Sequence, residues 1–325
     1  MGMSSLTNKF FDIQNVFLVL AHLYGVSIPS CRRVIKMALH AIDNATIDPL
    51  KISLPQSSEE LENLAQRWSP ISTSYGLFDG HIGALDGWLA QTEKPHVSNQ
   101  ADYFSGHYQC FGLNIQALCD PDLIFNYVCI AAPGKTNDVR AFGRCTGLVD
   151  WLDNLPDQYF ISGDNAYILS KKILTPFNGP EVFNETNRTY NFYLSQLRIR
   201  VEMAFGLLTT KWRRLRTNLN FSQPMNALII RVCFKLHNYC IRMSNDIHNS
   251  PTNDPTEYGI EPYINGTGTN DTYEFGFLPT NCNDDDTFSF FSCSNTDPSR
   301  RDSVVADITS RAIQRPLHNI TRNND

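Results

Sequence analysis

The chain has 325 residues, of which 42% are hydrophobic and 11% aromatic, and this is enough to bury a core, so a largely disordered or fibrous protein is excluded. Its nine cysteines include no CxxC pair and no cluster with histidine at zinc-ligand spacing, so we expect reduced thiols in an intracellular protein. The net charge of −6 does not exclude a nucleic-acid partner: residues 246–325 carry 13 Asp+Glu against 5 Lys+Arg, whereas residues 1–245 carry 20 against 22.

Two short helices are predicted at residues 16–42, separated at Gly25, with Ser27 as the N-cap of the second helix and Pro29 in its first turn. A helix-turn-helix needs a small residue, a turn residue and apolar contacts, and these fall on Ala21, Gly25, Val26 and Val34. Three basic side chains would then face DNA: Arg32, Arg33 and Lys36. We therefore interpret residues 1–70 as a small helix-turn-helix-like segment, with a plain helical hairpin as the alternative.

Residues 78–165 are rich in β-type runs. Three closely spaced runs, "HIGALDG", "HYQCFGLNIQALCD" and "LIFNYVCIAA", precede an amphipathic helix that ends near Leu152, and a fourth run, "QYFISGD", ends at Asp164. This order of three antiparallel strands, a helix, a strand and further helices is typical of a ribonuclease-H-like α/β core. In such a core the ends of the first and fourth strands lie side by side.

Three carboxylates fall at positions that this fold would bring together. Asp86 lies in the first run and Asp164 ends the fourth, although an Asp in a turn is commonly only a turn residue. Glu202 lies in a long helical pattern at residues 190–215, four residues after Arg198, where a surface ion pair is the simpler interpretation. Three carboxylates that meet would repel one another unless divalent cations neutralise them, and their hard oxygens favour Mg²⁺ or Mn²⁺. Two such ions could activate an attacking water or 3′-hydroxyl and stabilise the leaving oxygen of a phosphodiester.

Six motifs in this order resemble a family: "GALDGW", "FSGHYQCFGLNIQALCD", "TNDVRAF", "SGDNAY", "FYLSQLRIRVEMAFGLLTTKWRRL" and "CFKLHNYCI". Together they are similar to PIF/Harbinger-type DDE transposases and the nucleases derived from them, over roughly residues 75–245. The resemblance implies a ribonuclease-H-like catalytic domain in which Asp86, Asp164 and Glu202 bind the catalytic metals. It also implies double-stranded DNA as substrate, a nuclear location and, in many relatives, a Myb-like partner protein. Many relatives have a Thr-His pair in the first motif, where this chain has Gly87 and Trp88.

Other residues have both a functional and a structural interpretation. Asp138 in "TNDVRAF" could support the metal site or could simply cap a helix. His107 and His237 could contact phosphate, but buried structural histidines are more common. The segment "KWRRLR" offers four basic side chains on the predicted helix, either for the DNA backbone or as a solvated face: Lys211, Arg213, Arg214 and Arg216.

The C-terminal part is predicted to hold a disordered acidic linker at residues 246–298, which is rich in Asn, Thr and Asp, and then a short helix and tail at residues 299–325. No segment is long and apolar enough to span a membrane. The sequence thus predicts a metal-dependent DNA endonuclease or transposase that cleaves phosphodiesters and transfers strands by a two-metal mechanism. The alternative is a domesticated, catalytically silent DNA-binding or scaffold protein, and a homo-oligomer is compatible with either function.

Overall fold

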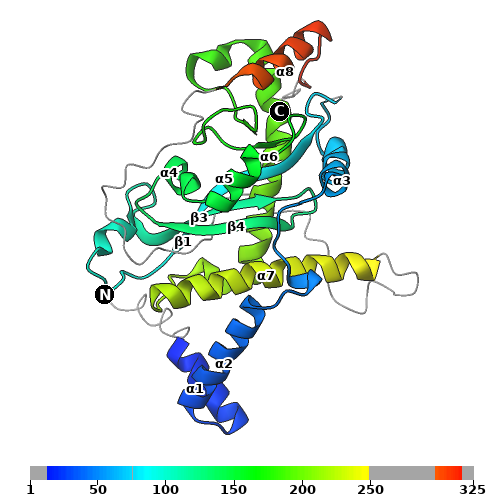
Figure 1. Ribbon diagram of the computed structural model, residues 1–325. Helices are drawn as coiled ribbons and strands as arrows, with labels where there is room; N and C mark the ends of the chain where they lie inside the picture. Colours follow the sequence, from blue (N-terminus) through cyan, green and yellow to red (C-terminus); the bar gives the residue numbers. More distant parts are fainter. Residues whose placement is uncertain (1–12, 75, 249–296, 317–325) are drawn as a thin grey trace, which may run out of the picture.

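The protein is built on one mixed β-sheet (Figure 1), and the computed structural model describes residues 13–74, 76–248 and 297–316. The central strand β1 (His81–Gln91) pairs antiparallel with β3 (Cys110–Cys119), which pairs antiparallel with β4 (Phe125–Pro133). On its other side β1 pairs parallel with β5 (Phe160–Ser162), and β5 pairs parallel with β6 (Ile173–Leu174). A two-residue strand, β2 (Phe104–Ser105), pairs with the start of β3. The expected mixed α/β class is therefore confirmed.

Helices cover both faces of the sheet (Figure 1). The face that carries Asp86 and Trp88 packs on the long helix α6 (Glu185–Lys211), because the Trp88 ring stacks on Phe205 with 6.0 Å between ring centroids. Helix α7 (Gln223–His248) lies beside α6, where Phe234 packs on Phe125 of β4. The opposite face carries α4 (Asp138–Gly143) and α5 (Thr146–Asp153). Helix α3 (Ser58–Trp68) packs on β1.

The two expected N-terminal helices are present as α1 (Ile13–Tyr24) and α2 (Ile28–Asp43), and they project from the body below α7 (Figure 1). Gly25 has a φ of +63°, which favours glycine at this turn, and Ser27 Oγ accepts a hydrogen bond from the Ser30 N–H at 3.2 Å. Asp43 joins the end of α2 to α7 through a bidentate ion pair with Arg231. Its Oδ1 accepts from Arg231 Nε at 2.8 Å and its Oδ2 from Arg231 Nη2 at 2.7 Å. The expected apolar contacts of Val26 and Val34 are wrong, because 45% and 62% of these residues are exposed. Helix α2 buries Cys31 instead.

Five short 3-10 helices complete the described secondary structure, together with α8 (Ser299–Ser310). They are η2 (Asp48–Leu50), η3 (Ser69–Ile71), η4 (Gln100–Tyr103), η5 (Gly179–Phe183) and η6 (Arg213–Arg216). The expected short C-terminal helix is present as α8, which packs on α6 and buries Val304 and Ile308. The predicted disordered linker falls on residues 249–296, outside the described part of the chain, and residues 246–248 continue α7.

The motif "CFKLHNYCI" lies on α7 and binds the start of the edge strand β4. Asn238 accepts a hydrogen bond from the Phe125 N–H and donates to the Phe125 carbonyl, both at 2.9 Å. His237 is 2% exposed and its Nε2 lies 2.9 Å from the Leu123 carbonyl oxygen. Asn238 and His237 therefore bind backbone groups at the turn between β3 and β4. The fold supports the structural interpretation of His237.

Two buried histidines should make the fold sensitive to acid. Burial lowers the pKa of His81 to about 3 and that of His237 to about 4. In the unfolded chain a histidine has a pKa near 6.5. Between these pH values both histidines are therefore neutral in the folded protein and protonated in the unfolded chain. The unfolded state then binds more protons, and the free energy of unfolding falls as the pH drops from about 6.5 toward 4, by up to about 1.4 kcal/mol per pH unit for each histidine. Urea unfolding at several pH values measures this slope. We expect His81→Asn to reduce it and His40→Gln, on the exposed side of α2, to leave it unchanged; an equal slope in all three proteins would contradict the assignment.

Candidate active site

Asp86 is a carboxylate within a strand that is buried on both faces. It is 8% exposed, and its Oδ1 accepts a hydrogen bond from the Gly87 N–H at 2.9 Å. Burial, together with the negative charges of Asp164 and Glu202, raises the pKa of Asp86 to about 8, against the opposing charge of Arg198. A carboxylate that is desolvated and crowded by like charges is stabilised in its ionised form by a cation.

Asp164 lies beside Asp86 because β5 runs parallel to β1. Ala84 is the partner of Ser162 in this pairing, and Asp86 and Asp164 each follow two residues later. Asp164 Oδ1 accepts a hydrogen bond from the Ala166 N–H at 2.9 Å, so the side chain does form the turn that its sequence context predicts. Its charge also acts on Asp86 and on Asp138, so the turn also places a carboxylate at the end of β5.

Glu202 reaches the same region from α6. Its neighbours Val201 and Phe205 are buried in the core, whereas Glu202 itself is exposed. Within the described residues Glu202 forms no ion pair, so the surface pair with Arg198 that the sequence suggested is not observed. The charge of Glu202 instead acts on Asp86.

Asp138 approaches Asp164 from the other face of the sheet. The helix-cap interpretation is wrong, because Asn137 is the N-cap of α4 and its Oδ1 accepts a hydrogen bond from the Arg140 N–H at 3.0 Å. Asp138 is the first residue inside the helix, and its Oδ1 accepts a hydrogen bond from Asn114 Nδ2 of β3 at 3.0 Å. Burial, and then the charge of Asp164, raise the pKa of Asp138.

The structure thus brings Asp164 and Glu202 within electrostatic reach of Asp86. In the described part of the chain, however, no three His, Cys, Asp or Glu side chains form a group that could hold a metal ion. Their carboxylate oxygens nevertheless suit Mg²⁺ or Mn²⁺, and the raised pKa of Asp86 marks a position where a cation would be stabilising.

Two roles near these carboxylates were not predicted from the sequence, that of Asn114 and that of Arg198. Asn114 is buried in β3, where its amide orients the Asp138 carboxylate. The charge of Arg198 acts on Asp86, whereas the sequence suggested a surface ion pair with Glu202. The available signals were an Asn among apolar strand residues and an Arg one helical turn before Glu202.

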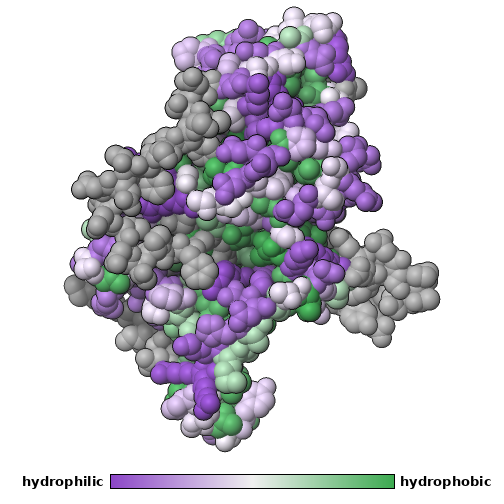
Figure 2. Space-filling view, viewed as in Figure 1, coloured by the Kyte–Doolittle hydropathy of each residue, from purple (hydrophilic) through white to green (hydrophobic). Residues whose placement is uncertain are grey.

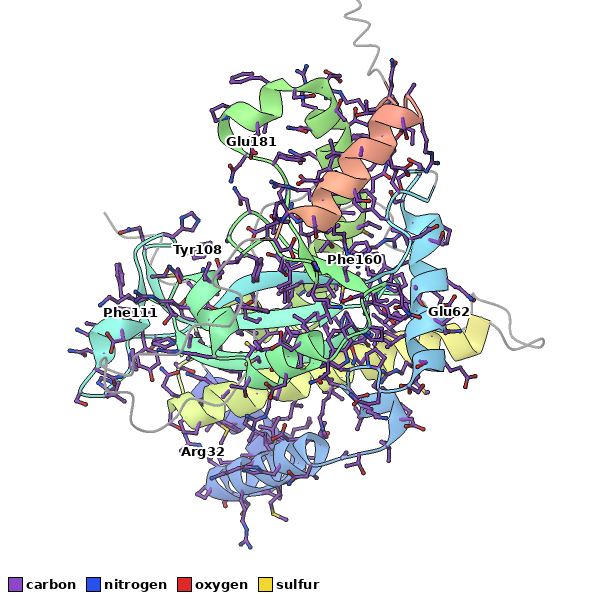
Figure 3. All side chains as sticks on the ribbon, turned by 45° about the horizontal axis from the view of Figure 1, so that its top comes forward. Arg32, Glu62, Tyr108, Phe111, Phe160 and Glu181 are labelled. Atoms are coloured by element: carbon purple, nitrogen blue, oxygen red, sulfur yellow. The ribbon has the colours of Figure 1, made fainter. Side chains whose placement is uncertain are left out.

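The basic residues of the N-terminal hairpin are positioned as a solvated surface. Arg32, Arg33 and Lys36 are all exposed on α2, and the Arg32 guanidinium lies 5.4 Å from the centre of the Phe17 ring. Figure 2 shows the hairpin projecting from the bottom of the molecule, and Figure 3 labels Arg32 on it. This arrangement is compatible with DNA contact and with a plain helical hairpin.

The basic segment after α6 differs from its prediction. The helix ends at Lys211, so Arg213, Arg214 and Arg216 lie in the 3-10 helix η6 and not on a continuous helix. Arg214 turns back on its own loop and donates to the Asn218 carbonyl at 3.1 Å and to Asn220 Oδ1 at 3.0 Å. Arg216 donates to Thr210 Oγ1 at 2.7 Å. The exposed side chains available for a DNA backbone are Lys211, Arg213 and Arg216.

Comparison with known proteins identifies the part of the chain that contains these carboxylates. Residues 85–238 match the family described as DDE superfamily endonuclease. This region is therefore similar to DDE superfamily endonucleases. Its bounds include Asp86, Asp164 and Glu202, and the family resemblance drawn from the six motifs is confirmed.

The chain is also similar to curated proteins. The chain is 25% identical to "Putative nuclease HARBI1" of Rattus norvegicus over 188 residues, which cover 56% of this chain and 53% of that protein. It is 24% identical to "Protein ALP1-like" of Arabidopsis thaliana over 243 residues, which cover 70% of this chain and 57% of that protein. The chain therefore spans about half the length of the curated relatives it matches. A comparison with solved structures gave no match.

Proposed function

We propose that the chain is a metal-dependent DNA endonuclease or transposase of the DDE type, with a ribonuclease-H-like architecture. The observation that supports the proposal is the parallel pairing of β5 with β1, because Asp86 within β1 and Asp164 just after β5 each follow a paired residue by two positions. The strand order β4-β3-β1-β5-β6, with three antiparallel strands followed by two parallel ones, supports the ribonuclease-H-like architecture.

Asp86, Asp164 and Glu202 are the residues that would hold Mg²⁺ or Mn²⁺, and Asp138 would support them through its effect on Asp164. Bound divalent ions would activate a water or a 3′-hydroxyl and stabilise the leaving oxygen of the phosphodiester. The chain itself keeps Asp86 out of bulk water and fixes Asp164 by its turn, so that the ligands are oriented before substrate arrives.

The proposed substrate is double-stranded DNA in the nucleus, with a Myb-like protein as partner and a second copy of the chain as a further candidate partner. Across the described residues, no helix has the length and apolar character needed to cross a membrane. The family assignment and the exposed basic side chains of α2 support the choice of DNA.

The test is strand cleavage on duplexes that carry candidate terminal inverted repeats, with Mg²⁺, with Mn²⁺, and with a chelator. We expect cleavage with either ion and none with the chelator, together with joined products when a target duplex is added. A chain that binds these duplexes but cleaves none of them with any metal would favour the catalytically silent DNA-binding or scaffold protein.

The hairpin should contribute to affinity and not to chemistry. Changing Arg32, Arg33 and Lys36 to Ala should weaken DNA binding and reduce the slope of log affinity against log salt by up to about three, because each phosphate contact releases about one counterion. Fluorescence anisotropy over a salt series measures this slope. Cleavage of bound DNA should persist in the triple variant. A salt slope equal to that of the parent would support the plain helical hairpin.

A further inference from the structure

Arg198 lies on the same side of α6 as Phe205, which faces β1. It precedes Phe205 by seven residues, or about two helical turns, so the two side chains share one side of the helix. Phe205 stacks on Trp88, which lies two residues after Asp86 on the same face of β1. Glu202 follows Arg198 by one turn, so the guanidinium and the proposed ligand are neighbours on the helix.

The guanidinium of Arg198 has no partner among the residues that the structure describes. Its Nε is buried without a hydrogen bond, a property that it shares with Arg188, Arg214 and Arg301. Those three arginines have other contacts: Arg188 pairs with Glu185, Arg214 bonds its own loop, and Arg301 lies 3.9 Å from the centre of the Phe177 ring. Arg198 forms no hydrogen bond and no ion pair with any described residue.

An unsatisfied buried donor is costly, so the Nε of Arg198 is suited to an acceptor that the described residues do not supply. Arg198 acts on Asp86 through its charge, yet it closes no ion pair with Asp86, Asp164 or Glu202. These carboxylates are the proposed metal ligands, and the strand bound to such metals presents non-bridging phosphate oxygens. A guanidinium fork matches two such oxygens, whereas an ammonium offers only a point charge.

We propose that Arg198 is a substrate-binding residue that donates hydrogen bonds to a phosphate of the DNA strand held at Asp86, Asp164 and Glu202. This inference rests on the proposed function and adds a named phosphate contact to it. A structural counter-charge for Asp86 is the competing role, and it predicts no preference for any one phosphate.

The test is a thermodynamic cycle between Arg198 and single phosphates. Duplexes carrying terminal repeats are made with one neutral methylphosphonate at each position around the cleavage site, and their affinities are measured with Ca²⁺ for the parent and for Arg198→Gln. We expect each change alone to weaken binding by about tenfold at one position, and the two together to weaken it little further, because contacting groups are not additive.

Arg188→Gln on the same helix is the matched control. Its fold-loss of affinity and that of the methylphosphonate should multiply at every position, because groups that do not touch act independently. If Arg198→Gln does not fold, Arg198→Lys takes its place, because it keeps the positive charge. The Lys variant should show a weaker coupling to the methylphosphonate at the same position. Independent losses at every position for Arg198→Gln, or for Arg198→Lys in its place, would overturn the inference.

The outcome separates this inference from the proposed function, because binding with Ca²⁺ requires no turnover. Position-specific coupling in a chain that cleaves no DNA would retain the Arg198 contact and reject the nuclease. Metal-dependent cleavage by the parent without such coupling would retain the nuclease and reject the contact.

Discussion

Replacing Asp164 by Asn should reduce metal-dependent strand cleavage by at least about a thousandfold, which corresponds to a loss of roughly 4 kcal/mol of transition-state stabilisation. Asn keeps the size of the side chain and retains an oxygen that can accept the Ala166 N–H, so the turn after β5 should survive. The substitution removes the negative charge that a hard cation needs. Cleavage should therefore collapse while folding and DNA binding remain.

Cleavage would be followed with Mn²⁺ on terminal-repeat DNA, beside Glu202→Gln, which should have an effect of the same order. Asp153→Asn, an exposed carboxylate at the end of α5, is the control and should retain parental activity. Thermal unfolding and DNA affinity of each variant establish that the loss is chemical. Full activity in both Asp164→Asn and Glu202→Gln would defeat the assignment of these carboxylates.

The sequence predicted those features of the fold that depend on local chemistry. Alternating and continuous apolar runs located β1, β3, β4 and β5, because a strand buried against neighbours needs such residues. Ser27 and Gly25 marked the start of α2 and the turn before it, because an N-cap hydroxyl and a positive φ are requirements of one or two residues. The order of the runs then predicted that Asp86 and Asp164 would meet.

Long-range partners could not be predicted from these patterns. The Asp138 carboxylate is oriented by Asn114, 24 residues earlier in the chain, and no local spacing indicates this pair. The same limit applies to Arg198, whose sequence position suggested a pair with Glu202 while its neighbours in space include Asp86. Propensity describes what a segment can form, whereas the pairing of segments depends on the packing of the whole domain.

Helix α8 is a further element whose long-range partner was not predicted. Its apolar spacing predicted a helix but not the surface that it covers. Val304 and Ile308 are 8% and 2% exposed, and the helix packs on α6. Arg300 lies 4.7 Å from the centre of the Phe160 ring on β5, and its Nε donates to the Lys171 carbonyl at 2.8 Å (Phe160 is labelled in Figure 3). Strand β5 leads to Asp164, so α8 supports the strand that positions this carboxylate.

Introducing Asp at both Val304 and Ile308 should detach α8 and lower the free energy of unfolding by about 3–5 kcal/mol, because two buried aliphatic side chains are lost and a buried charge is unfavourable. The midpoint of thermal unfolding should fall by roughly 5–10 °C. Trypsin should then cut at Arg300 and Arg301, which are held against Phe160 and Phe177 in the parent.

The matched control places the same two charges on the exposed side of α8, as Ser303→Asp and Ala306→Asp, and should change neither the midpoint nor the cleavage pattern. Because β5 lies under Arg300, detaching α8 should also reduce metal-dependent cleavage, by less than Asp164→Asn does. Equal stability and equal trypsin resistance in the two double variants would show that α8 does not brace the sheet. A fall in stability confined to the Val304 and Ile308 variant would make residues 299–310 part of the folded domain, through side chains that act on the site only by supporting β5.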